Sequence, residues 1–476
     1  MKIIPTPKEQ KLRDDASAVY LAPTVEKNAD FGEAVAAFQH YAQALCGLDI
    51  QSVENGATIC IKKDDTLCEE AYDLEIDADG VKITASEECG ANHAFATLLQ
   101  LMSEKDGRIE LPVVTVRDKP DSLYRGLMVD LARSWHPLSY LLSYVDMCYY
   151  YKLSVLHLHF TDDESYTLPS RLYPKLSTVG QSYTRGEIRS LVEYAHCRRV
   201  QLMPEIDVPG HCKSFQSEYG EIFGTKGVIC QHEKSIAAMK ALFAELCDMF
   251  PYSKYIHIGG DEAHHKDEWA RCPECLAYAK QVGIDADMED KELLAQQMYA
   301  HFIMEMAQTC FDKGRQPIVW EGFSKAVDDR ISKKIWVMSW ENYYQITPDL
   351  LAAGFQIINC PWSPMYVVAP KCMWSPKEVL EQTIYQWRAI HPSSPYLNET
   401  YSAPPDAAVL GGQLLAWGDH IVKDYPSVAE GVQDEWHKLL ERVPMLAEKT
   451  WNVQAAKLYE AIETTVSALQ KKFMKL

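Results

Sequence analysis

The sequence predicts an α/β protein whose larger part is a (β/α)8 TIM barrel, preceded by a small α+β domain and followed by helices. From Leu123 onward, short apolar runs alternate with longer amphipathic segments, about eight times over about 300 residues. Before that point, strand-like and helical patterns are mixed. We therefore expect a small α+β domain over 1–120, a (β/α)8 barrel over 121–425 and a C-terminal helical extension over 426–476.

The first domain is predicted from two kinds of periodicity. Apolar residues recur at helical spacing over 34–45 and 90–102, whereas residues over 57–62, 72–76 and 80–85 have strand character. The domain should therefore pair a small sheet with two helices.

The barrel is predicted from eight strand-like runs, which end before polar or aromatic residues in nearly every unit. They lie at 125–129, 155–160, 201–205, 255–258, 316–320, 334–338, 356–359 and 411–417. Helical stretches at 137–151, 184–198, 235–250 and 292–313 separate several of them. A doubly wound open sheet is the alternative. No glycine-rich phosphate turn follows the first strand, so a dinucleotide site has no support.

The composition and net charge limit the classes of molecule that the protein can bind. The 476 residues carry a net charge of −20, which disfavours nucleic acid and anionic membrane surfaces and is compatible with an uncharged sugar. No apolar run has the length of a signal peptide core or a membrane span. Fourteen cysteines are scattered without framework spacing, so we expect reduced thiols and a cytoplasmic protein. A homodimer stays an open alternative.

The run 255–265 carries the strongest chemical signal. A β-branched strand ends in Gly259 and Gly260, and the carboxylates Asp261 and Glu262 follow directly. Glycines allow a sharp turn and a close approach of a ligand. Two crowded carboxylates cannot both ionise freely, so one pKa should rise, as acid-assisted cleavage of a glycosidic bond requires. The alternative is an Asp-Glu cap on a following helix.

The segment His-Ile-Gly-Gly-Asp-Glu at 257–262 resembles the signature of glycoside hydrolase family 20, the β-N-acetylhexosaminidases, and the similarity extends roughly over residues 70–420. The resemblance implies removal of a terminal GlcNAc or GalNAc from a glycan or amino-sugar substrate, without a cofactor. It implies that Glu262 acts as general acid and then base. Asp261 would orient the substrate acetamide, whose own oxygen attacks the anomeric carbon.

Charged residues after the first three strands are the next candidates. Arg133 could present a planar fork to sugar hydroxyls, and its alternative is an ion pair with Asp130. The resemblance assigns Arg133 to the terminal hydroxyls and Asp162 to a sugar hydroxyl. It assigns Asp207 and His211 to support of the acid and the pocket floor. An Asp–His pair can also stabilise a loop.

Aromatic residues at or beyond later strands complete the candidate pocket. Trp320, Trp340 and Trp417 are expected to stack around the sugar and its N-acetyl group, although each also suits a core position. By resemblance, Tyr366 hydrogen-bonds the acetamide carbonyl, and Asp419 binds outer hydroxyls.

Two positions depart from the family pattern. Many relatives have an aspartate where this chain has Val368, so that contact is missing or supplied elsewhere. They usually have a glutamate where this chain has Asp419. Because the aspartate side chain is shorter, its contact with the outer hydroxyls and the preference between sugars stay open.

A metal is considered at two places, and none is assigned. His157 and His159 should point to one face of their strand, where satisfied interior histidines are favoured over a metal. Cys272 and Cys275 form half of a zinc pattern, and no second pair is spaced to complete it. A loop staple or free thiols are favoured there. A two-carboxylate barrel glycosidase and an inactive carbohydrate-binding barrel remain the alternative functions.

Overall fold

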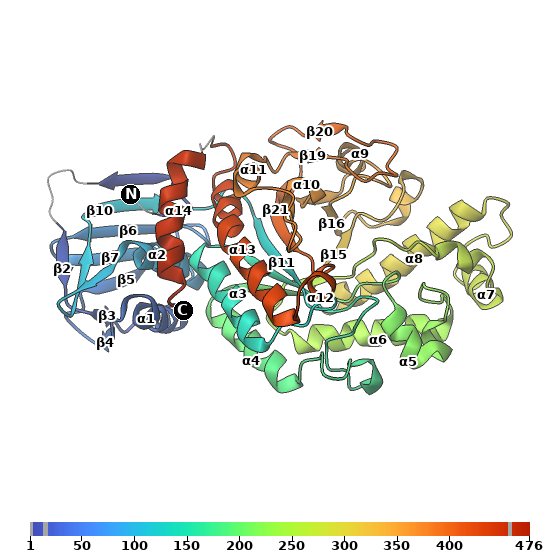
Figure 1. Ribbon diagram of the computed structural model, residues 1–476, viewed down its shortest axis with the longest axis horizontal. Helices are drawn as coiled ribbons and strands as arrows, with labels where there is room; N and C mark the ends of the chain where they lie inside the picture. Colours follow the sequence, from blue (N-terminus) through green and yellow to red (C-terminus); the bar gives the residue numbers. More distant parts are fainter. Residues whose placement is uncertain (1–2, 13–17, 456–458) are drawn as a thin grey trace.

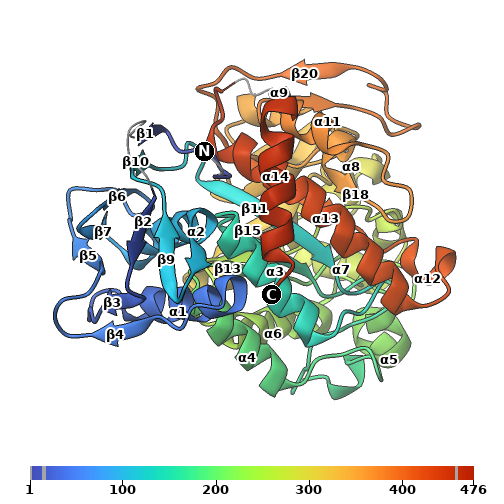
Figure 2. The ribbon, with the colours of Figure 1, turned by 60° about the vertical axis from the view of Figure 1, so that its left-hand side comes forward.

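The computed structural model of the protein describes residues 3–12, 18–455 and 459–476. A mixed sheet domain occupies one end and a parallel barrel the other (Figure 1). The C-terminal helices α13 and α14 lie side by side where the two parts meet (Figure 1, Figure 2). No helix in these residues is long and apolar enough to cross a bilayer.

The N-terminal domain is built on a sheet that, among the described residues, has the order β1-β10-β6-β7-β5-β3-β4. Its strands are β1 (Glu9–Leu12), β3 (Thr24–Glu26), β4 (Gln51–Val53), β5 (Ile59–Lys63), β6 (Tyr72–Asp77), β7 (Gly80–Ala85) and β10 (Val114–Asp118). A smaller sheet contains β2 (Val19–Leu21), β8 (Ser103–Lys105) and β9 (Arg108–Leu111). Helices α1 (Gly32–Cys46) and α2 (Glu88–Leu101) pack together, and their apolar faces are buried.

The barrel strands are parallel, and the first strand pairs with both the second and the last. They are β11 (Tyr124–Asp130), β12 (Val155–His159), β13 (Gln201–Glu205), β14 (Tyr255–His257), β15 (Gln316–Trp320), β16 (Trp336–Ser339), β17 (Gln356–Asn359) and β21 (Val409–Ala416). Because β11 closes on β21, the sheet is a barrel and not the open alternative. The predicted fold class is therefore confirmed.

An excursion interrupts the last unit. Between β17 and β21 the chain forms β18 (Tyr366–Val367), which pairs with the end of β21, and a hairpin of β19 (Gln386–Arg388) and β20 (Thr400–Ser402). This segment brings residues to the pocket that a plain strand-helix unit would not supply.

Helices surround the barrel, and several begin with a side-chain cap. The α helices are α3 (Leu138–Tyr150), α4 (Arg185–Cys197), α5 (Lys213–Phe223), α6 (Glu233–Met249), α7 (Pro273–Gln281), α8 (Lys291–Asp312), α9 (Thr347–Ala352), α10 (Trp362–Met365), α11 (Pro376–Glu381), α12 (Ile421–Asp424), α13 (Val428–Trp451) and α14 (Tyr459–Phe473). Short 3₁₀ helices are η1 (Pro174–Leu176), η2 (Lys266–Ala270) and η3 (Lys325–Arg330). Thr184 and Glu187 form a capping box at α4, and Asp290 caps α8.

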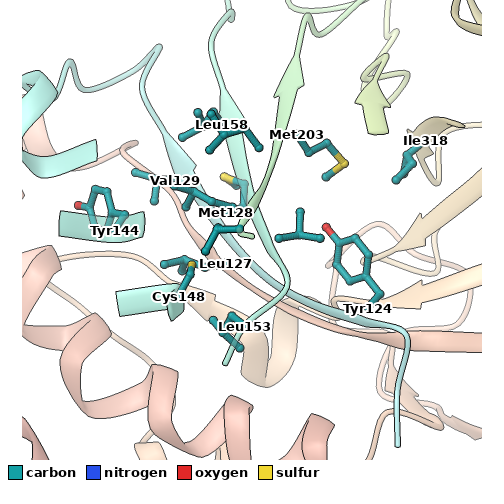
Figure 3. Close-up of a cluster of buried hydrophobic side chains, with 14 of the residues drawn as sticks. Tyr124, Leu127, Met128, Val129, Tyr144, Cys148, Leu153, Leu158, Met203 and Ile318 are labelled. Carbon is teal, nitrogen blue, oxygen red and sulfur yellow. The ribbon is translucent and has the colours of Figure 1, made fainter. Parts of the chain in front are cut away.

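The strands of the barrel are buried on both faces. In Figure 3, Leu127 and Val129 of β11 lie on the side of Tyr144 and Cys148 of α3, whereas Tyr124 lies on the other side. A parallel strand covered on both faces reads as a continuous apolar run, which is why β11 was recognisable in the sequence.

Buried charges join the two parts of the molecule. The guanidinium of Arg125, on β11, is fully buried and pairs with Glu70 of the N-terminal domain, with Nη1 3.1 Å from Oε2. Nearby, Lys152 Nζ lies 3.4 Å from Asp118 Oδ2 and 4.8 Å from the ring centre of Trp451. Arg125 is thus a structural residue.

Candidate active site

A pocket of about 280 Å³ opens at the carboxyl ends of the barrel strands. It collects nine of the eleven predicted site residues: Arg133, Asp207, His211, Asp261, Glu262, Trp340, Tyr366, Trp417 and Asp419. Four further residues line it: Trp362, Val368, His391 and His420. Asp162 and Trp320 are not in the lining.

The turn after β14 aims the two adjacent carboxyls. Gly259 and Gly260 have φ values of +81° and +108°, and Glu262 has φ +45°, a left-handed conformation that is uncommon for a residue with a side chain. A Cβ at Gly259 would overlap Asp207 Oδ1, and the amide of Gly260 donates to that oxygen at 3.2 Å. The absence of a side chain at Gly259 therefore leaves space for Asp207. From the sequence we expected that this space would admit a ligand.

Asp261 is a buried carboxyl with an unused acceptor. Its side chain lines the pocket, and its Oδ1 has no hydrogen-bond partner among the described residues. Burial raises the pKa of Asp261 to about 7; His211 opposes the shift, and the charge of Glu262 adds to it. The raised pKa that we expected for one of the two adjacent carboxyls thus falls on Asp261.

Glu262 ends a chain of hydrogen-bonded groups. Its Oε2 lies 3.3 Å from His211 Nε2, and His211 Nδ1 lies 3.0 Å from Asp162 Oδ1. The bond from His211 lowers the pKa of Glu262, although partial burial opposes this. Burial alone would lower the pKa of His211, but the carboxylates of Asp207 and Asp162 raise it well above its ordinary value. One proton is therefore held between His211 and Glu262.

Asp162 lies beneath the pocket and not in its wall, so the predicted contact with a sugar hydroxyl has no support in the structure. Its Oδ2 pairs with Arg133 Nη2 at 2.8 Å and with His159 Nε2 at 3.0 Å. Burial would raise the pKa of Asp162, but His211, His159 and Arg133 hold it well below its ordinary value. Together with His211 and the Asp163 amide on Oδ1, these groups occupy both oxygens of the carboxylate.

Arg133 satisfies both of its interpretations. Nη1 lies 3.1 Å from Asp130 Oδ2, which is the structural ion pair, while the guanidinium also lines the pocket. The guanidinium carbon, Cζ, lies 5.1 Å from the ring centre of Trp417, and Nε lies 3.7 Å from Asp419 Oδ1. The fork is therefore fixed on several sides before any ligand binds.

The pocket walls contain the aromatic side chains of Trp340, Trp362, Tyr366 and Trp417. The rings of Trp340 and Tyr366 are nearly parallel, with an interplanar angle of 12° and centroids 6.2 Å apart, and the Trp417 centroid lies 5.9 Å from that of Tyr366. Trp320 is instead fully buried outside the pocket lining, and its Nε1 donates to Glu205 Oε1 at 2.6 Å. It thus has the core position that was its alternative, and a contact of its ring with the sugar stays a prediction.

The barrel interior below the pocket is a histidine network around Glu205. Oε2 of Glu205 lies 3.0 Å from His157 Nε2 and 2.5 Å from His159 Nδ1, and Oε1 lies 2.8 Å from His257 Nδ1. Both ring nitrogens of His157 and of His159 thus have hydrogen-bond partners inside the barrel. These contacts also fix the ends of β12, β13 and β14, from which the catalytic candidates project.

Sequence reasoning missed several pocket residues. Trp362 stands four positions before the predicted site residue Tyr366 and could have been found there. His391 comes from the excursion before β21, which carries no barrel pattern. Its Nε2 lies 3.5 Å from Glu341 Oε1, and burial, with the charge of Glu321, raises the pKa of Glu341 to about 9.

Fold and pocket together define a (β/α)8-barrel protein with an acidic, aromatic-walled site. The chain belongs to glycosyl hydrolase family 20: the family's catalytic domain matches residues 123–454, and its domain 2 matches residues 1–119.

Curated relatives and solved structures are similar to this chain. A β-hexosaminidase of Akkermansia muciniphila is 33% identical over 285 residues, which are 54% of this chain and 56% of the relative. One from Vibrio furnissii is 27% identical over 347 residues, 65% of this chain and 55% of the relative. The chain thus spans little more than half the length of these relatives.

The structural likeness covers the whole fold. A β-N-acetylhexosaminidase from Bacteroides fragilis has a TM-score of 0.80 at 20% identity, covering 99% of this chain and 95% of that one. An exo β-N-acetylglucosaminidase from Vibrio harveyi, solved with N-acetylglucosamine, has a TM-score of 0.78 at 21% identity, covering 100% of this chain and 77% of that one.

Proposed function

We propose that the protein is an exo-acting β-N-acetylhexosaminidase that removes a terminal GlcNAc or GalNAc from a glycan with retention of configuration. The observation that carries this proposal is the buried Oδ1 of Asp261, an acceptor to which none of the described residues donates, in the pocket wall beside Glu262. A buried acceptor without a partner costs free energy unless a ligand supplies one. An acetamide N–H is the donor that this substrate class brings.

The reaction then follows from the positions of two carboxyls. Asp261 accepts the acetamide N–H and holds the acetamide carbonyl oxygen over the anomeric carbon. That oxygen attacks the carbon as the glycosidic bond breaks, and Glu262 protonates the leaving oxygen. The product of this step is an oxazolinium ion, whose positive charge the Asp261 carboxylate stabilises. Glu262 then removes a proton from the water that opens the ring.

Intramolecular attack explains why no cofactor is needed. A well-oriented neighbouring group can supply about 7–11 kcal/mol of the barrier through prepaid entropy. The parallel rings of Trp340 and Tyr366, with Trp417, form walls that would hold the sugar in one orientation.

The proton for the leaving group is supplied by the His211–Glu262 pair. In the empty pocket His211 keeps Glu262 largely ionised. A bound sugar removes water from the carboxyl, which raises its pKa and favours transfer of the shared proton from Nε2 of His211 to Oε2. His211 is thus a positioning residue, and Asp162 keeps it charged.

The outer end of the pocket is assigned to Arg133 and Asp419, which would bind the hydroxyls of the non-reducing sugar. The charge of Asp419 faces the guanidinium. Because the side chain of Asp419 is shorter than that of the glutamate usual at this place, the hydroxyl at C4 of the sugar would be held mainly by Arg133. We expect both GlcNAc and GalNAc to be accepted.

The deciding experiment is hydrolysis of chromogenic β-glycosides of GlcNAc, GalNAc and glucose, together with inhibition by a thiazoline mimic of the cyclised intermediate. We expect cleavage of the two acetamido sugars only, and strong inhibition. Cleavage of the glucoside at a similar rate would instead indicate a two-carboxylate glycosidase. Binding of the mimic without any turnover would indicate a carbohydrate-binding barrel.

A further inference from the structure

Three cysteines from two different loops meet beside the barrel. Cys230 lies between α5 and α6, in the loop after β13, and Cys272 and Cys275 stand at the start of α7, in the loop after β14. The Cys230 sulfur lies 3.2 Å from that of Cys275 and 4.0 Å from that of Cys272. Sulfurs bound to one tetrahedral zinc are about 3.8 Å apart, given Zn–S bonds of about 2.3 Å. The three thiols therefore have the spacing of a metal site.

A fourth ligand is within reach. His232, two residues after Cys230, offers a ring nitrogen within 4.8 Å of the Cys230 sulfur. Its Nδ1 accepts a bond from the Ser235 amide at 3.2 Å, so the proton is on Nε2, which lies 3.9 Å from Glu274 Oε2. Zinc binding through Nδ1 would replace the bond from the Ser235 amide, and Glu274 would hold the proton on the other nitrogen, as a carboxylate usually does for metal-bound histidine. Glu274 itself is largely exposed and is a weaker candidate.

The surroundings favour thiolates. The backbone amide of Gln231 donates to the Cys275 sulfur at 3.3 Å. Cys272 is the N-cap residue of α7, where the first amides of the helix favour negative charge. Cys275 is buried and Cys230 and Cys272 are partly buried, so a bound ion would be shielded from water.

We propose that Cys230, His232, Cys272 and Cys275 bind one zinc ion, which fastens the loop after β13 to the loop after β14. The sequence offered only the Cys-x-x-Cys half, because the Cys-x-His half lies 40 residues earlier and is brought near by the fold. None of the four ligands lines the pocket, so the ion is structural. Binding releases the thiol protons.

The two loops also carry the catalytic candidates. Ile229, next to Cys230, donates its amide to the Pro209 carbonyl at 3.0 Å and accepts a bond from Trp269 Nε1 at 2.9 Å. Pro209 lies two residues before His211, and Trp269 lies in the segment that follows Glu262. A metal beside these contacts would fix the relative position of the His211 and Glu262 segments.

A disulfide is the competing interpretation of the same sulfurs. A Cys230–Cys275 disulfide would leave Cys272 and His232 without a role, and it requires an oxidant. All fourteen cysteines are unpaired in the structure. Metal content and thiol chemistry therefore separate the two interpretations.

The test uses the full chain, expressed in zinc-containing medium and purified with a reductant and without chelator. We expect about one zinc per chain by elemental analysis, and a cobalt-exchanged protein with the thiolate-to-cobalt absorption and visible bands of a tetrahedral site. Cys275→Ser and Cys272→Ser should each lower zinc content at least about tenfold at a competing chelator concentration that leaves the wild type loaded. His232→Ala should weaken binding less, because the three thiolates remain.

The matched control is Cys310→Ser. Cys310 is buried and hydrogen-bonded to Cys247, so it resembles the cluster in burial and in having a thiol neighbour, without a third ligand. Its zinc content should equal that of the wild type, as should that of Glu262→Gln in the pocket. Stripping zinc should lower the melting temperature and make 224–232 and 263–272 more sensitive to protease. A wild type without zinc and without the cobalt–thiolate band would overturn the proposal. So would equal zinc content in Cys275→Ser and Cys310→Ser, or a Cys230–Cys275 disulfide found by mass spectrometry in the reductant-purified chain.

Discussion

The buried carboxyl of Asp261 lowers the stability of the folded protein and supplies the acceptor that the proposed reaction needs. In the part of the chain that the structure describes, nothing donates to its Oδ1, and burial raises the pKa of the Asp261 carboxyl to about 7. A group with a raised folded-state pKa contributes most to stability when protonated, and that contribution is lost as pH rises towards the folded pKa. Function and stability are therefore opposed at this residue.

We predict that Asp261→Asn is more stable than the wild type at neutral and alkaline pH. The difference should be near zero below pH 4, grow between pH 4 and pH 7, and level off at about 4 kcal/mol above pH 7, since one pKa unit is worth about 1.4 kcal/mol. Urea unfolding across this range measures it. Asp65→Asn, at a largely exposed carboxyl, is the control and should show no such pH dependence. A constant difference at all pH values would contradict the raised pKa.

Glu262→Gln removes the proton donor and keeps the size of the side chain. Turnover of substrates with poor leaving groups should fall by roughly 10²–10⁴, whereas activated aryl glycosides should lose much less because they need little protonation. Steady-state kinetics on both classes measures this. Equal losses on both would argue against the acid role.

At the residue scale, the sequence located most of the pocket because the candidates follow strand ends, and strand ends meet on one face of a barrel. It could not separate Arg133, which reaches the pocket, from Asp162, which is covered by Arg133, His159 and His211. It also could not show that Trp320 would find Glu205 as a buried acceptor. Both outcomes depend on contacts between strands far apart in the sequence.

At the scale of the element, the turn after β14 shows how little space the site leaves. Gly259 has φ +81°, and an added Cβ would overlap Asp207. Gly180 has a similar φ of +76° with open space around it, so the two glycines differ only in crowding.

We predict that Gly180→Ala costs about 1–2 kcal/mol, the ordinary cost of a left-handed residue, whereas Gly259→Ala costs more and also abolishes turnover. The additional loss arises because Asp207 and the turn cannot both keep their places. Denaturant unfolding and hydrolysis of the chromogenic substrate measure the two effects. Equal stability losses in the two variants would show that the turn can relax.

Elements with strong patterns were predicted and weak ones were not. β13, β15 and β17 have the predicted bounds, because each is a short apolar run between helices. The excursion with β18, β19 and β20 was missed, since these two- and three-residue strands carry no readable period. The exposed strand β1 was missed for the same reason.

At the scale of the molecule, the ion pair of buried Arg125 with partly buried Glu70 joins the N-terminal domain to the barrel. Arg125 is fully buried and also donates to the carbonyl of Lys152 at 3.0 Å. Removal of one member of a buried pair leaves an uncompensated charge, which is costlier than the pair itself is stabilising.

Glu70→Gln should therefore destabilise the protein by about 3–5 kcal/mol. Glu69→Gln is the matched control, because Glu69 is the neighbouring residue, is largely exposed and pairs with Lys254 on the surface at 3.5 Å. The free energy of unfolding of this variant should stay within about 0.5 kcal/mol of the wild-type value. Denaturant midpoints of the two variants give the comparison. Similar values would mean that water reaches Arg125.

The unused acceptor of Asp261 also makes ligand capture a proton-release reaction. Near pH 7 its carboxyl is about half protonated, and an acetamide N–H can be accepted only by the ionised form. Binding of N-acetylglucosamine, which keeps its acetamide N–H, should then expel roughly half a proton per chain at pH 7 and almost none at pH 9. Calorimetric heats measured in phosphate and in Tris should differ at pH 7 in proportion to the ionisation heats of the two buffers, and should converge at pH 9. Identical heats at pH 7 would show that Asp261 is already ionised in the empty pocket.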